Sequence, residues 1–241
     1  MNSRIFARDV ASGTTLSVVT DRTQGGSSMA DGSVELMVHR RLQHDDGRGV
    51  GEPLDEPGLN ALGTGLVVRC VHRLSLDVAA SAPRVGKRAV QELMFKPQVL
   101  LSPLAAGTTP QAWARAHRAN FSGLTAPLPA NLHLVTTHAL GPQTVLVRLA
   151  HLFQAGEDAE LSAPATVALT TLFAATQLSG CVETTVPGSQ PLAAVRVRTV
   201  SVDGEGASTY PTIPPPPAGP GQEVTVSAME VRTFMCSFAP A

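Results

Sequence analysis

Short runs in which apolar and polar residues alternate recur along most of this chain, and turns that contain Gly or Pro separate them. The clearest run is Asn131–Phe153, NLHLVTTHALGPQTVLVRLAHLF, which predicts two strands joined across Gly141 and Pro142. A period of two places the apolar side chains on one face of a strand, and that face must be buried against another layer. The pattern therefore predicts a mainly β, or all-β, fold.

The same pattern predicts further strands before and after this pair. We expect them at Ile5–Phe6, Thr14–Thr20, Ser33–Arg41, Gly65–Val78, 165–173, 177–186, 192–202 and 223–238. A helical signal is weaker and occurs once, where Ser81 precedes Ala82–Met94 with apolar residues at helical spacing. We therefore expect one short helix among many strands.

Strands at this spacing, separated by Gly- and Pro-rich turns, are typical of β-sandwiches. The chain has 241 residues, enough for two ordinary domains. The Pro-rich turn Thr125–Asn131 precedes a fresh strand pair, so we expect one sandwich over residues 1–129 and a second over residues 130–241. The low-complexity run Asp203–Gly221 contains Pro214–Pro217, which favours polyproline II. A solvent-exposed loop and a docking site for a proline-binding module both remain open for it.

Composition excludes several classes of function. The formal net charge is −1, without the basic surplus of a nucleic-acid binder. Only 4% of the residues are aromatic, which argues against an exposed aromatic platform for sugars or bases. No uncharged apolar run reaches about 18 residues, so we expect no membrane-spanning helix. The opening residues, MNSRIFARDV, contain no apolar h-region and predict no signal peptide; they resemble a strand already begun, so we expect further chain before them.

The three cysteines, Cys70, Cys181 and Cys236, lie far apart and form no C-x-x-C motif. This spacing predicts neither a zinc knuckle nor a redox pair. The odd number leaves at least one thiol unpaired within the chain. Because a free cysteine packs like a small hydrophobic residue, we expect all three to be small buried residues.

The densest polar stretch is His39–Gly49, HRRLQHDDGRG. Asp45 and Asp46 are adjacent, and in an extended chain neighbouring side chains point to opposite faces. The two carboxylates of a glycosidase flank one bond and are about 5–9 Å apart, usually on different elements. Adjacent acids beside Gly47 and Gly49 therefore favour a turn over a catalytic pair.

Metal binding is the second possibility for this stretch. His39, His44, Asp45 and Asp46 are all permissible zinc ligands. Arginines 40, 41 and 48 stand among them, however, and a positive charge beside a dication is unfavourable. Pairing of arginines with aspartates is simpler, because the guanidinium matches a carboxylate in two hydrogen bonds. We therefore assign no metal ligand to this chain.

Two other motifs are less informative. Ser27 and Ser28 follow two glycines, but QGGSSM does not match the nucleophile elbow of serine hydrolases. Asn120 opens an N-F-S glycosylation acceptor, which matters only in a secreted chain. The residues alone thus indicate a β-rich protein whose charged loop supports another structural element, and they do not identify that element.

Longer segments carry a family resemblance. Thr20–Leu54, TDRTQGGSSMADGSVELMVHRRLQHDDGRGVGEPL, resembles the C-terminal β region of glycoside hydrolase family 38, the class II α-mannosidases. The segments LVVRCVHRLSLD, LMFKPQVLLSP and MEVRTF resemble the same family, most of all its lysosomal or vacuolar branch. The resemblance extends from about Asn2 to Phe238.

The resemblance implies a function for a longer protein. Members of the family are retaining exo-glycosidases that remove terminal α-linked mannose, and their zinc ion and aspartate nucleophile lie in an N-terminal catalytic domain. No position of this chain matches those groups, so we expect no catalytic residue, metal or cofactor here and no activity of the isolated chain. The implied partners are the catalytic domain of the same enzyme and mannose-containing glycans. The implied location is the lysosome, the vacuole or the secretory pathway.

The resemblance also implies roles for the charged loop, because the family places the loop with the two arginines near the mouth of the active site. His39 and either Arg40 or Arg41 would line its rim. Strand alternation would let only one arginine reach the site, and the sequence leaves open which. Asp45, Asp46 and Arg48 would hold the loop's shape or pair across the domain interface. A free-standing carbohydrate-binding β-module and a purely structural β-domain are the alternatives.

Overall fold

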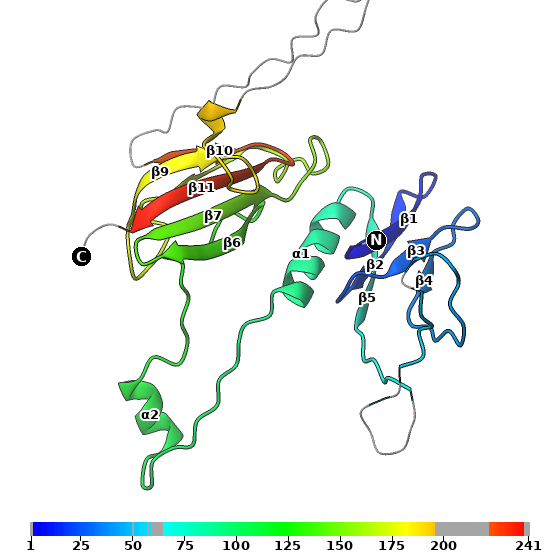
Figure 1. Cartoon of the computed structure of the whole chain (residues 1–241), viewed down its shortest axis with the longest axis horizontal. Coiled ribbons are helices and arrows are strands. Elements are labelled where there is room, and N and C mark those ends of the chain that lie inside the picture. The colour runs from blue at the N-terminus through cyan, green and yellow to red at the C-terminus, as the bar shows by residue number, and fades with distance from the viewer. Residues whose placement is uncertain (1, 50, 57, 59–64, 196–221, 239–241) are drawn as a thin grey trace, which may run out of the picture. The chain divides into compact units, whose positions relative to one another are not determined.

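The computed structural model describes the whole chain except residues 1, 50, 57, 59–64, 196–221 and 239–241. It divides into two compact units, Met1–Leu100 and Leu101–Ala241 (Figure 1). Most of the regular structure is antiparallel β, which confirms the predicted fold class. The sandwich domains expected over residues 1–129 and 130–241 stay a prediction.

The first unit is built on a three-stranded antiparallel sheet. Its strands are β1 (Arg4–Asp9), β2 (Thr14–Thr20) and β5 (His72–Val78), in the order β1-β2-β5. The predicted strand Thr14–Thr20 is confirmed, and β2 lies in the centre with most of its residues buried. A tight turn with Gly13 at φ +67° joins β1 to β2, because glycine tolerates that backbone conformation.

Helix α1 (Ala82–Met94) follows β5 and confirms the predicted helix. Pro83 lies in its first turn, where a missing N–H costs nothing, although the Ser81 side chain makes no capping hydrogen bond. Arg4 of β1 donates to Ala82 O at 3.3 Å, which ties the sheet to the start of the helix. Gly86 permits this approach, because a Cβ there would lie 2.5 Å from Arg4 Nε.

A second, two-stranded sheet pairs β3 (Gly25–Ser27) with β4 (Glu35–Met37). The strands predicted over Ser33–Arg41 and Gly65–Val78 are therefore too long. A strand extends only as far as its partner, and β4 has a three-residue partner. Strand β5 begins at His72, which pairs with the last residue of β2.

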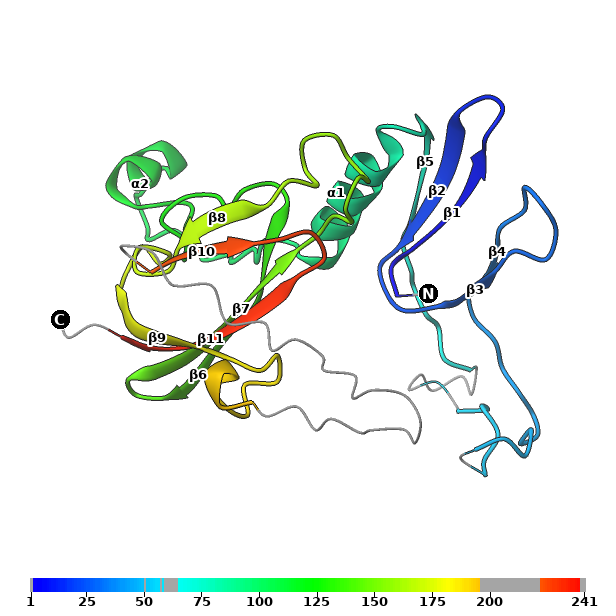
Figure 2. The ribbon, with the colours of Figure 1, turned by 90° about the horizontal axis from the view of Figure 1, so that it is seen from above.

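The second unit has two β layers. Strands β6 (Leu132–Gly141), β7 (Thr144–His151), β11 (Val231–Phe238) and β9 (Leu178–Thr184) form one sheet in the order β6-β7-β11-β9. Strands β10 (Glu223–Val226) and β8 (Ala165–Ala168) form the other (Figure 2). The predicted β6–β7 hairpin is confirmed. The core contains Leu132, Val145, Val147, Leu149, Ala165, Leu169, Leu172, Leu178, Val224, Val226, Phe234 and Cys236.

The second unit also has helical segments that the sequence analysis did not predict. Helix α2 (Pro110–Ala116) begins after Thr109, whose Oγ1 accepts a hydrogen bond from Ala112 N at 3.2 Å. The cap followed by proline is a helix-start signal that was available in the sequence. The 3-10 turn η1 (Leu192–Ala194) stands where the strand 192–202 was expected. The rest of that strand, and Pro214–Pro217, lie outside the described residues.

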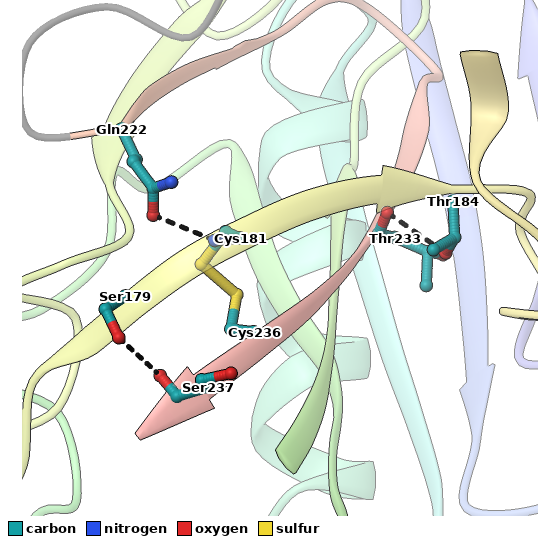
Figure 3. The surroundings of a disulfide bond; sticks show 7 residues. All are labelled: Ser179, Cys181, Thr184, Gln222, Thr233, Cys236 and Ser237. Carbon is teal, nitrogen blue, oxygen red and sulfur yellow. Dashed lines mark hydrogen bonds between the residues drawn. A yellow bond between two sulfur atoms is a disulfide. The ribbon is translucent and has the colours of Figure 1, made fainter. Parts of the chain in front are cut away.

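The prediction that all three cysteines are small buried residues is wrong, because two of them are joined and only Cys236 is fully buried. Cys181 of β9 and Cys236 of β11 form a disulfide, 55 residues apart in sequence (Figure 3). The bond lies where the β9–β11 register shifts between Met235 and Ser237. Sequence spacing could not show this pairing, because only the sheet brings the two strands together. Cys70 is half-buried and its thiol is free. The odd number of cysteines required at least one unpaired thiol.

Candidate functional site

The charged loop His39–Gly49 belongs to the first unit and begins just after β4, which ends at Met37. Residues 39–41 therefore lie outside any strand. The prediction that strand alternation separates Arg40 from Arg41 is wrong for this reason, and other contacts must distinguish the two arginines. Every residue from His39 to Gly49 is exposed except Leu42, which is half-buried.

Two contacts join the first residues of the charged loop to the segment that follows it. Arg41 forms an ion pair with Asp55, and Leu42 N donates to Leu54 O at 3.0 Å. The hydrogen bond and charge of Asp55 raise the pKa of Arg41 above its ordinary value. The partner of Arg41 is thus Asp55, whereas the sequence suggested Asp45 or Asp46.

The tip of the loop is a turn. Asp46 Oδ1 accepts a hydrogen bond from Arg48 N at 3.0 Å, and Gly47 between them has φ +69°. The backbone at Gly47 is in the left-handed region, which favours glycine over any other residue. Asp46 therefore fixes the turn through the backbone of Arg48, in agreement with the turn expected at the adjacent acids.

Arg40 differs from Arg41 in its contacts. Within the described part of the chain, the exposed Arg40 side chain makes no hydrogen bond or ion pair, and His39 beside it makes none either. A guanidinium that has no partner among these residues keeps all five of its donors for another molecule. No group of three or more His, Cys, Asp or Glu side chains among the described residues is arranged to hold a metal ion.

A polar cluster that the sequence did not predict lies at the end of β2. Asp21 and Arg22 form a two-bond ion pair at 2.9 and 3.0 Å, and Arg22 also donates to Arg69 O at 2.6 Å. Asp21 accepts a further bond from Val71 N at 3.1 Å. The Arg22 guanidinium is the main cause that lowers the pKa of Asp21 to about 2. The cluster joins the end of β2 to the segment before β5.

Gln24 makes a second connection in this region. It is buried, its Oε1 lies 2.8 Å from His72 Nε2, and its Nε2 donates to Val38 O at 3.5 Å. One side chain thus connects the start of β5 with the residue that precedes His39. The TDRTQ segment alone could not predict that its glutamine is buried, because that burial depends on the pairing of β2 with β5.

The other candidate positions lie in the second unit. A groove of about 330 Å³ follows β9 and β11 and is lined by Thr184, Gln190, Met235 and their neighbours. The described residues that line it carry no ionisable side chain. Asn120 is exposed, as a glycosylation acceptor must be. Trp113 and His117 of the α2 segment stack with ring centroids 4.7 Å apart.

Comparison with known proteins agrees with the sequence resemblance. The model of the glycosyl hydrolases family 38 C-terminal domain matches residues 1–48. The lysosomal alpha-mannosidase of Bos taurus is 42% identical over 240 residues, which is 98% of this chain. That of Homo sapiens is 40% identical over 244 residues, and an alpha-mannosidase of Arabidopsis thaliana is 35% identical over 246 residues.

The chain belongs to the C-terminal region of glycosyl hydrolase family 38. It spans less than a quarter of these relatives: 23% of the bovine, 22% of the human and 23% of the Arabidopsis protein. The family 38 match includes β1 to β4 and the charged loop as far as Arg48. Among the residues that the structure describes, no helix of this family 38 region is long and apolar enough to cross a membrane.

Proposed function

We propose that this chain is the C-terminal region of an α-mannosidase that removes terminal α-linked mannose from glycans as a retaining glycosidase. The observation that carries the proposal is the extent of the match: 98% of the chain aligns with a lysosomal alpha-mannosidase, of which it forms 23%. The zinc ion and the nucleophile then belong to the remaining polypeptide. The loop supports this division, because Asp46 is engaged in a turn with the Arg48 backbone.

Within that enzyme, the charged loop braces the catalytic part and lines the rim of the active site. Arg41 is held by Asp55, and Asp46 is held to the Arg48 backbone, so these residues set the shape of the loop. Arg40 and His39 are exposed and make no such bond within the described residues, so they face the substrate side. Guanidinium and imidazole groups donate hydrogen bonds to sugar hydroxyls there and position the glycan without taking part in bond cleavage.

The enzyme works in the lysosome, the vacuole or the secretory pathway. The Cys181–Cys236 disulfide supports this location, because disulfides persist in oxidising compartments and are rare in the cytosol. The exposed position of Asn120 agrees with it. The catalytic part of the same polypeptide and mannose-containing glycans are the partners.

The test is a chimera in which residues 1–241 replace the matched region of the bovine relative. We expect hydrolysis of a synthetic α-mannoside by the chimera, and none by the isolated chain or by the bovine protein with the region deleted. An inactive, folded chimera would contradict the proposal. A sugar-binding module would instead bind mannan as the isolated chain, so titration of that chain with mannan separates the two functions.

A further inference from the structure

The two faces of the β1-β2-β5 sheet are unlike in polarity. Residues opposite one another in an antiparallel pair share a face. The registers Arg4↔Val19↔Arg73 and Phe6↔Ser17↔Ser75 therefore define one face, which is mainly polar. Helix α1 covers this face: Arg4 donates to Ala82 O, and Arg73 donates to Glu92 Oε2 at 2.9 Å.

The opposite face is apolar and open. The registers Ala7↔Leu16↔Leu76 and Ile5↔Val18↔Leu74 place aliphatic side chains side by side on all three strands, and Val78 extends the row. Leu74 is 68% exposed, Leu76 71% and Val78 64%. Leu16, on the central strand, is 37% exposed, whereas its neighbour Ser17 on the α1 side is fully buried. Val18, in the second of these rows, is buried. Ile5, Ala7, Leu16, Leu74, Leu76 and Val78 are called the open face below.

This arrangement is the reverse of what stabilises a free-standing domain. An antiparallel sheet with one wet face turns its polar side chains to water and buries its apolar side. Here the polar residues of the central strand, Thr15 and Ser17, are fully buried on the α1 side, although Arg73 on the same face stays exposed, and most of the apolar face meets solvent. A contiguous, exposed aliphatic patch on a sheet marks a surface that another layer covers.

We infer that the open face is an interface for the remaining polypeptide of the α-mannosidase, which packs its own apolar side chains against β1, β2 and β5. The inference rests on the proposed function. The length of chain outside this region favours that occupant, because the relatives are more than four times as long as the part they share with this chain. The family domain match, residues 1–48, also includes β1 and β2, so two of the three strands of the open face belong to a segment that the family carries.

The test measures burial directly. Leu76→Cys is introduced in a Cys70→Ser background, both in the isolated chain and in the bovine chimera, and its reaction with a maleimide is timed. We expect the thiol to react at least 10-fold more slowly in the chimera. Leu74→Cys is a second probe if Leu76→Cys impairs folding. Val182→Cys is the matched control, because Val182 is exposed on a strand of the other unit, and it should react similarly in both proteins.

Each outcome decides one question. An active chimera in which Leu76→Cys and Leu74→Cys react as fast as in the isolated chain would overturn the inference and leave the proposed function standing. An inactive chimera with protected thiols would support the interface and contradict the proposed function. Slow reaction in the isolated chain, together with a dimer on gel filtration, would overturn the inference in favour of a second copy of the chain.

Discussion

Arg232 of β11 and Glu183 of β9 form a largely buried ion pair between two neighbouring strands of the second unit. Arg232 Nε and Nη2 donate to the two Glu183 oxygens at 2.8 and 2.6 Å, and Nη1 donates to Thr225 O of β10 at 2.6 Å. The Arg232 side chain is 4% exposed. One guanidinium therefore connects two strands of the larger sheet with a strand of the smaller one.

Breaking this ion pair should lower the stability of the second unit. Glu183→Gln leaves the buried Arg232 charge without its counter-charge, which should lower the free energy of unfolding by about 3–5 kcal/mol. Urea denaturation of wild type and variant measures the change. Glu92→Gln is the control, because Glu92 pairs with Arg73 and Arg88 at the surface and its loss should cost about 1 kcal/mol or less. Equal losses in both variants would contradict the importance of burial.

The disulfide should stabilise the second unit. It closes a span of 55 residues, for which the chain-entropy model gives about 4 kcal/mol as an upper figure. Cys181→Ala with Cys236→Ala, or a reductant, should therefore lower the thermal midpoint of this unit. Cys70→Ser, which touches the free thiol, should leave that midpoint unchanged. A reductant-insensitive melt would show that the bond contributes nothing.

The two loop arginines should behave differently in the chimera. Arg40→Ala should lower kcat/KM by roughly 10- to 1000-fold with the fold intact, because a lost charge-assisted hydrogen bond is worth about 1.5–3 kcal/mol or more. Arg41→Ala breaks the exposed pair with Asp55 and should change kcat/KM less. Steady-state kinetics on an α-mannoside, with thermal melts of both variants, distinguishes them. Unchanged kinetics for Arg40→Ala would remove it from the rim.

Asp21 should make the stability of the first unit depend on pH in the acidic range. Its pKa falls from 3.8 to about 2 in the folded chain, mainly through Arg22, so the unfolded chain binds the proton first as the pH falls. The stability it contributes is present above pH 3.8 and is lost as the pH approaches about 2. The difference in urea midpoint between wild type and Asp21→Asn should therefore shrink across that range. A difference that stays constant would contradict the assignment.

Asn120 should carry a glycan when the chain is made in a secretory host. The residue is exposed and opens the acceptor Asn120-Phe121-Ser122. Intact-mass measurement should show one modification that an endoglycosidase removes and that Asn120→Gln abolishes. An unmodified wild-type chain from such a host would contradict the expectation.

Local sequence patterns were sufficient where the structure depends on neighbours in the chain. The β6–β7 hairpin follows from alternation on both sides of a Gly-Pro turn, and α1 follows from helical spacing after β5. The charged loop was found for the same reason, because its polar residues are contiguous. These features need only a few residues at fixed spacing, which a single sequence displays.

Tertiary structure alone decided the features that depend on distant partners. The ends of β4 and β5 are set by the lengths of β3 and β2, and the Cys181–Cys236 bond requires β9 beside β11. The distinction between Arg40 and Arg41 likewise comes from Asp55, across the loop. Alternation in β1, β2 and β5 showed that each strand has two faces. Only the position of α1 decided that the polar face is covered and the apolar face is open, because burial is a property of the packed layers and not of any one strand.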